Sequence, residues 1–377
     1  MTRRSPRSAA GSILARLALG LVAAVLLLAL AEGAASAYLF ASDFRAAAGP
    51  NTVTRPHTTY DTLLGWVNRK SFVSPNEFGP GLTLTTDAQG FRDTRDVTPV
   101  APAGEVRLVC SGDSFTLASG IADGLHWCAQ LESRLPGLRT MNMGQGMYGL
   151  DQAYLWYARD GVPYAHDAQI LAITDVMLER STTGTYSGRN KPYFELDHGR
   201  LAARNVPVPR QTTEELRVVY AARAVEDLRL MQLIRRIPMF GGRRSVEEAS
   251  TKSFPIFEKI FDDLRAIHAR HGSRLIIVYL PTKRDMRPGL HDAWRRRIAG
   301  YAHGHGVPFF DLTPAMRKLR PDSLDLVWIT RVPAGSPTGV PGHYTNLGHL
   351  WVARVLADSL ATLPEFARLA PQEHGAR

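Results

Sequence analysis

Cysteine is scarce in this chain, and its scarcity excludes several classes of protein. Only two of the 377 residues are cysteine, which rules out a small scaffold held together by disulfides. No Cys-x-x-Cys pair or paired Cys/His spacing predicts a structural zinc site, and we expect no metal and no cofactor. The 32 glycines and 24 prolines follow no period that would indicate a collagen-like or low-complexity chain.

Acidic residues are outnumbered by basic ones, at 35 against 45, which leaves a formal net charge of +10. The excess is mostly scattered arginine, with short clusters such as Arg295-Arg296-Arg297. A scattered basic surface favours solvation, or attraction to an anionic polymer, over a nucleic-acid site. We therefore expect no nucleic-acid partner.

An apolar segment near the N-terminus predicts export. Leu17–Ala31 is uncharged; it falls short of the roughly 20 residues that a spanning helix needs, but apolar residues resume after Glu32. Arginines precede the segment and Asp43-Phe44-Arg45 follows it, which orients its N-terminal end toward the cytoplasm. We predict a single-pass anchor in the inner, cytoplasmic membrane. The alternative is a signal peptide cleaved after Ala35-Ser36-Ala37, which would leave a secreted or periplasmic protein.

Beyond the N-terminal tip and anchor, residues 1–43, composition divides the chain into three parts. Residues 44–104 are rich in Pro, Gly, Asn and Asp, and indicate a linker and a flap with short strands. Residues 105–361 carry the pattern of one α/β domain, and residues 362–377 form a C-terminal tail.

An insertion at residues 181–250 interrupts the α/β pattern. Asp197-His198-Gly199 indicates a turn, and a helical pattern extends from about Glu214 to Arg236. The insertion is long for a connection between a strand and a helix, so we expect a lid or a platform for substrate.

Five short apolar runs predict the buried strands of a sheet. They are Val106–Cys110, Arg139–Met143, Ala168–Thr174, Arg274–Leu280 and Val307–Leu312. Amphipathic stretches lie between them. Buried strands that alternate with helices imply a parallel sheet covered on both faces.

Residues suited to catalysis occur at two places. Gly112-Asp113-Ser114 directly follows the first strand, and a serine at such a turn lies where open α/β sheets place their active sites. A plain helix N-cap is the alternative, because Asp and Ser both cap helices well. Near the C-terminus, Thr345 or Asn346 can cap the helical run Leu350–Leu360, which leaves His343 on the preceding loop.

Together these motifs resemble the blocks of SGNH, or GDSL-type, serine hydrolases. Gly112-Asp113-Ser114 matches the first block, and His343, Gly348 and His349 match the last in residue and spacing. Asn142–Gly149 with Gln152 is similar to the family's N-x-G-x-x-G-Y-G-x-x-Q block.

The resemblance covers roughly residues 60–361. Upstream segments also resemble membrane-anchored bacterial members: Tyr60-Asp61, Leu64-Gly65-Trp66 and Gln89-Gly90-Phe91-Arg92. The resemblance implies a three-layer α/β/α sandwich with a central, flavodoxin-like parallel sheet of about five strands.

By this resemblance Ser114 is the nucleophile and His343 the general base. The backbone N–H of Ser114 would donate to the oxyanion. Gly146 and Met147 would form the rest of the oxyanion hole, together with Thr174, which stands where the family has asparagine.

The carboxylate that the family pattern places two or three residues before the histidine is absent, because Val340 and Pro341 stand there. Either a backbone carbonyl holds His343 in a Ser-His dyad, or an acid such as Asp322 or Asp325 reaches it. Cys110 and Cys128 could form a disulfide in an oxidising compartment, or remain two buried thiols.

We therefore predict an extracytoplasmic serine esterase that hydrolyses short acyl esters, such as acetyl esters, on an envelope carbohydrate or another small substrate. One alternative is an O-acyltransferase that uses the same Ser114 and His343. Another is a binding protein that keeps the cleft without turnover. The membrane would be contacted through the N-terminal helix.

Overall fold

The computed structural model describes residues 6–48, 55–216, 218, 243–289, 291–331 and 340–369. The chain divides into two units. The larger, Thr54–Thr212 with Arg243–Arg377, contains the sheet and the candidate site; the smaller comprises Met1–Val53 and Thr213–Gly242.

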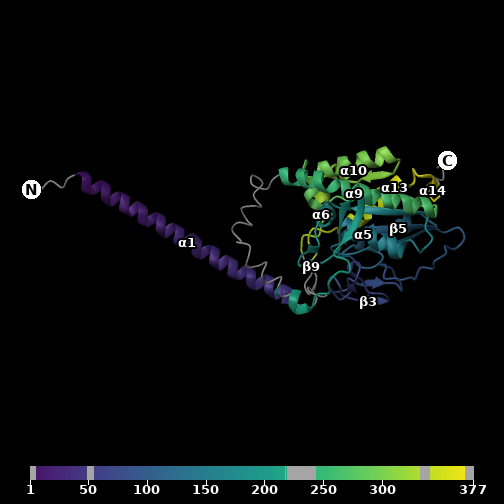
Figure 1. Ribbon diagram of the computed structural model, residues 1–377, viewed down its shortest axis with the longest axis horizontal. Helices are drawn as coiled ribbons and strands as arrows, with labels where there is room; N and C mark the ends of the chain where they lie inside the picture. Colours follow the sequence, from purple (N-terminus) through teal and green to yellow (C-terminus); the bar gives the residue numbers. More distant parts are fainter. Residues whose placement is uncertain are drawn as a thin grey trace, which may run out of the picture. The chain divides into compact units, whose positions relative to one another are not determined.

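Five parallel strands form the central sheet of the larger unit, in the order β13-β12-β7-β5-β6 (Figure 1). Their bounds are β5 Val106–Gly112, β6 Leu138–Gly144, β7 Ala168–Ile173, β12 Arg274–Tyr279 and β13 Phe309–Asp311. In sequence, the chain passes from β5 to β6 at one edge of the sheet and then crosses to β7 on the other side of β5. This order confirms the predicted flavodoxin-like sheet, whose switch point lies at the carboxyl ends of β5 and β7.

Side chains on the strands alternate between two apolar layers. Val109, Leu171 and Ile277 pack in one cluster with residues of α5 (Leu150–Trp156), α9 (Arg243–His271) and α10 (Asp292–His305). Their sequence neighbours Leu108, Ile170 and Ile276 pack in a second cluster with α4 (Trp127–Arg134) and α13 (Asn346–Leu360). Because both faces are covered, the strands are largely apolar in the sequence, although β6 also contains Arg139, Thr140 and Asn142.

Short elements complete the larger unit. The helices are α3 Ser114–Leu117, η1 Tyr157–Gly161, α6 Asp175–Arg180, η2 Lys283–Met286, α11 Thr313–Arg317, α12 Pro321–Asp325 and α14 Pro364–Ala367. The antiparallel hairpins are β1 Thr58–Asp61 with β2 Gly65–Asn68, β3 Phe72–Ser74 with β4 Leu84–Thr86, β8 Thr185–Tyr186 with β9 Arg189–Asn190, and β10 Tyr193–Asp197 with β11 Arg200–Arg204.

The flap is packed against the turn that follows β6. Trp66 Nε1 donates to Gly146 O at 3.0 Å, and Tyr148 Oη donates to Trp66 O at 2.5 Å. Gln145 Nε2 donates to Asn68 Oδ1 at 2.6 Å. The flap therefore shapes the site from outside the sheet.

The described part of the insertion is held to α5. The predicted turn is present between β10 and β11, where His198 and Gly199 have positive φ angles of 48° and 75°. Lys191 Nζ is buried and forms an ion pair with Asp151 Oδ2 at 2.5 Å. The helix expected at about 214–236 falls largely outside the described residues, and a lid role stays a prediction.

Among the described residues of the smaller unit, one helix is long and apolar enough to cross a membrane. Within α1 (Pro6–Ala48) this segment is Ala15–Tyr38, 24 residues long. Ser36 Oγ donates to Glu32 Oε1 at 3.0 Å, which gives the acidic side chain a partner one helical turn away. The helix runs without interruption past Glu32, as a membrane anchor requires, but a signal sequence passes the same test.

Candidate active site

Ser114 is presented by the turn between β5 and α3. Asp113 caps α3, because its Oδ1 accepts from the Phe115 N–H at 2.9 Å. Its Oδ2 accepts from Thr174 Oγ1 at 2.9 Å and pairs with Arg180 Nη1 at 3.3 Å. Burial raises the pKa of Asp113, while the Arg180 charge opposes the rise. Asp113 caps the helix and Ser114 is the residue after it. A helix cap and a candidate nucleophile can therefore both be present in this motif.

His343 lies within hydrogen-bonding distance of Ser114. The distance from His343 Nε2 to Ser114 Oγ is 2.8 Å, and His343 Nδ1 lies 3.2 Å from the carbonyl oxygen of Val340. A carbonyl can only accept, so Nδ1 carries the proton and the lone pair of Nε2 faces the serine hydroxyl. The ring stacks on Phe115 at a centroid distance of 4.8 Å. This is the tautomer that a general base needs.

The environment of His343 favours its neutral form. The pKa of His343 is lowered to about 4, chiefly by burial; the positive charges of Arg180 and Arg55 contribute to the fall, and the hydrogen bond to the Val340 carbonyl opposes it. The imidazole is therefore unprotonated at neutral pH and available as a base.

The structure does not bring either candidate acid to His343. Asp322 and Asp325 lie on α12, and both are exposed. Among the described residues, the hydrogen-bond partner of Nδ1 is the Val340 carbonyl. The loop is fixed by its main chain, because Ile329 N donates to His343 O and Gly342 N to Ile329 O, both at 2.8 Å. The arrangement is the Ser-His dyad alternative.

Two of the expected oxyanion donors are engaged elsewhere. The Thr174 hydroxyl donates to Asp113 Oδ2. Thr174 is also the N-cap of α6, where its hydroxyl oxygen accepts from Met177 N. The Gly146 N–H donates to Gln145 Oε1 at 2.7 Å.

Ser114 and Met147 remain as donors for an oxyanion. Ser114 is the first residue of α3, so the helix makes no use of its N–H. Met147, at a φ of 70°, lines the same pocket, and no hydrogen bond of its N–H is present among the described residues.

Arg92 holds the far end of α3 in place. Its buried guanidinium donates to the carbonyl oxygens of Leu117, Ala118 and Ile121, at 2.5, 2.8 and 2.5 Å. In the sequence only the resemblance singled out this residue. The partners of Arg92 are backbone carbonyl oxygens, which every residue has, so no sequence pattern marks them. The role of Arg92 is therefore visible only in the folded structure.

A cavity of about 130 Å³ opens beside Ser114 and His343. Ser114 and His343 line it together with Arg55, Phe78, Ser119, Met147, Arg180 and Val340. Sequence reasoning missed Arg55, Phe78, Ser119 and Arg180. Arg180 lies only six positions after Thr174, at the end of α6, and this closeness to an expected site residue could have pointed to it. No feature of the sequence pointed to Arg55.

Cys110 and Cys128 are free and buried, so the disulfide considered above is not formed. Burial raises the pKa of the Cys128 thiol, and its hydrogen bond with Cys110 adds to the rise. Both thiols belong to the apolar layer between the sheet and the helices α4 and α13; Cys110 lies on β5 and Cys128 on α4.

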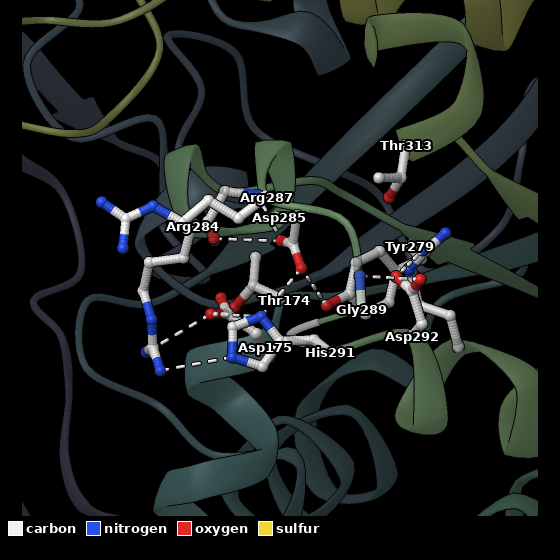
Figure 2. A network of polar contacts seen from close by, with 12 residues as sticks. Thr174, Asp175, Tyr279, Arg284, Asp285, Arg287, Gly289, His291, Asp292 and Thr313 are labelled. Carbon is white, nitrogen blue, oxygen red and sulfur yellow. Dashed lines mark hydrogen bonds and ion pairs between the residues drawn. The ribbon is translucent and has the colours of Figure 1, made fainter. Parts of the chain in front are cut away.

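A second polar cluster lies at the carboxyl ends of β7 and β12 (Figure 2). Asp175, Asp285 and His291 offer ligand atoms within 4.8 Å of one another. Arg284 Nη2 donates to His291 Nε2 at 3.3 Å, so His291 Nδ1 carries a proton and donates to Asp285 Oδ1 at 3.0 Å. Arg284 Nη1 also lies 3.3 Å from Asp175 Oδ2. The guanidinium supplies the positive charge that a metal would supply, and we assign no metal here.

Comparisons with known proteins find similar solved structures at low sequence identity. No protein-family model matches the chain, and no curated protein matches it. Among solved structures, a member of the lipolytic protein G-D-S-L family from Veillonella parvula is 13% identical with a TM-score of 0.37, covering 70% of this chain and 100% of that one.

Two further structures are similar at the same level. A lipase/acylhydrolase from Enterococcus faecalis is 11% identical with a TM-score of 0.36, covering 71% of this chain and 99% of that one. An alpha/beta hydrolase enzyme from the metagenome of Lake Arreo is 14% identical with a TM-score of 0.37, covering 70% and 98%. What the site can do is therefore argued from its own geometry.

Proposed function

We propose that this protein is a serine esterase of the SGNH type that acts on short acyl esters. The observation that carries the proposal is the 2.8 Å contact between Ser114 Oγ and His343 Nε2, with the other ring nitrogen held by a carbonyl. A serine whose proton faces an unprotonated, oriented imidazole is an activated nucleophile.

The chemistry follows from this pair. Ser114 Oγ attacks the ester carbonyl carbon while its proton moves to His343 Nε2, and the carbonyl oxygen becomes an oxyanion beside the N–H groups of Ser114 and Met147. Collapse of this intermediate breaks the bond to the alcohol, which takes the proton from His343. Water then repeats the sequence on the acyl-enzyme and releases the acid.

The size of the cavity favours a short acyl group. The cavity measures about 130 Å³, well below the roughly 300–1,000 Å³ of common small-molecule pockets, which suits an acetyl group better than a long chain. An envelope carbohydrate as the bearer of the ester fits an extracytoplasmic enzyme held by α1. Transfer to a sugar hydroxyl would use the same residues, with the acceptor in place of water.

Two measurements test the proposal. A fluorophosphonate should label wild-type protein and not Ser114→Ala. On a p-nitrophenyl ester series, kcat/KM should be highest for acetate and fall with chain length. No labelling together with no turnover would leave only the binding-protein alternative.

A further inference from the structure

Two guanidinium groups line the small cavity that contains Ser114 and His343. Arg55 comes from the start of the flap and Arg180 from the end of α6. None of the described residues that line the cavity is acidic. Since the cavity measures only about 130 Å³, a molecule that reaches Ser114 also comes close to both positive charges.

Arg180 is buried and has unused hydrogen-bonding capacity. It is 8% exposed, and its Nη1 makes two long contacts, 3.3 Å to Asp113 Oδ2 and 3.3 Å to Tyr148 O. Its Nε is buried and has no hydrogen-bond partner among the described residues. The guanidinium lies over the Tyr186 ring at 4.7 Å, which holds its plane. A buried donor without an acceptor costs free energy that a ligand can recover.

Arg55 lies against the turn after β6. A Cβ atom at Gly146 would come within 2.7 Å of Arg55 Nη1, so the guanidinium occupies the space that this glycine leaves beside Met147. Both arginines also depress the pKa of His343, which agrees with their closeness to the reacting atoms.

We propose that the cavity recognises acyl esters of an anionic carbohydrate, and that Arg55 and Arg180 bind a carboxylate of the sugar beside the ester. The inference rests on the proposed esterase function and names its substrate class. Arginine suits this task, because its planar fork binds a carboxylate through two parallel hydrogen bonds. Both residues are then specificity determinants for the group that carries the ester.

The test compares two substrates that differ in charge. These are a mono-O-acetyl methyl glucuronoside and its methyl ester, assayed with full-length protein in detergent. Wild type should prefer the acid at least tenfold in kcat/KM, and added salt should reduce the preference. In Arg55→Gln and Arg180→Lys the ratio should fall toward one. Arg287→Gln removes a positive charge from another pocket of the larger unit and should keep the ratio.

Other results would overturn the proposal. Equal turnover of acid and methyl ester by wild type would do so. The proposal would also be overturned if Arg55→Gln and Arg180→Lys slowed the acid and the methyl ester equally, since the arginines would then act on the oxyanion. Binding of methyl glucuronoside and its methyl ester to Ser114→Ala, measured by calorimetry, separates this inference from the esterase function. If Ser114→Ala binds the acid more tightly than the methyl ester and the wild type turns over neither acetylated substrate, charge recognition is supported and the esterase function is contradicted. If the wild type turns over both substrates and Ser114→Ala binds acid and methyl ester equally, the esterase function is supported and charge recognition is contradicted.

Discussion

The imidazole of His343 is oriented by the main chain of Val340, three positions earlier, and not by a carboxylate. The distance from Nδ1 to the Val340 oxygen is 3.2 Å. A carbonyl dipole fixes the tautomer as an acid would, but it stabilises the imidazolium less than a full negative charge does. The pair Ser114 and His343 therefore has the geometry of a triad with weaker electrostatic support.

The first prediction concerns pH. Burial lowers the pKa of His343 to about 4, and the neutral imidazole is the active form. Activity should therefore hold from pH 7 to about 5 and fall as the pH drops through about 4. The measurement is kcat/KM for p-nitrophenyl acetate against pH, with Ser114→Ala as background. An acidic limb between 6 and 7 would indicate a carboxylate beside the ring.

The second prediction concerns Asp322 and Asp325. Both are exposed on α12, so Asp322→Asn and Asp325→Asn should each leave kcat within about twofold of wild type, as is usual for surface substitutions away from the site. His343→Gln is the positive control and should lower kcat by about a thousandfold or more. Loss of activity in either aspartate variant would mean that an acid does reach His343.

The third prediction concerns restoring an acid at position 340. Val340 is 4% exposed in an apolar cluster with Phe78, Leu84 and Leu117. Val340→Asp should lower the free energy of unfolding by about 2 kcal/mol or more, because it buries a polar group without a partner. Val340→Thr keeps the shape and should cost about 1 kcal/mol. Thermal unfolding measures both. A rise in kcat in the aspartate variant would contradict this account.

The fourth prediction compares two glycines. A Cβ at Gly144 would overlap the backbone of Leu117, because the end of β6 packs directly on α3. Gly144→Ala should destabilise the protein by about 3 kcal/mol. Gly300 lies in the interior of α10 with nothing within 4 Å of a Cβ atom, so Gly300→Ala should stabilise it by about 0.5–1 kcal/mol. Denaturant unfolding measures the stability of both variants. If Gly144→Ala proved more stable than Gly300→Ala, the close packing of β6 on α3 would be refuted.

The fifth prediction concerns the N-terminal helix. If Ala15–Tyr38 is an uncleaved anchor, the protein should fractionate with membranes and keep these residues. Intact mass of detergent-extracted protein measures this. Removal of residues 1–48 should release the larger unit into the soluble fraction. A mature N-terminus at Tyr38 would instead indicate a cleaved signal peptide.

The sequence by itself predicted the sheet and the closeness of Ser114 and His343, which the structure places 2.8 Å apart. The five strands are apolar runs because both faces of the sheet are buried, and this leaves a local pattern that can be read directly. Ser114 follows β5 and His343 precedes α13, so their places were set by the ends of elements. The resemblance then joined them across 229 positions.

Only the tertiary structure decided what surrounds this pair. The partner of His343 Nδ1 is a backbone oxygen, which every residue has and no sequence pattern marks. Thr174 occupied the expected position, yet its hydroxyl donates to Asp113, because α6 needs an N-cap and Asp113 needs a donor. Arg55 and Arg180 are far apart in the chain and line the same cavity only because the flap packs against the turn that follows β6. Contacts of this kind depend on long-range packing, which local periodicity does not encode.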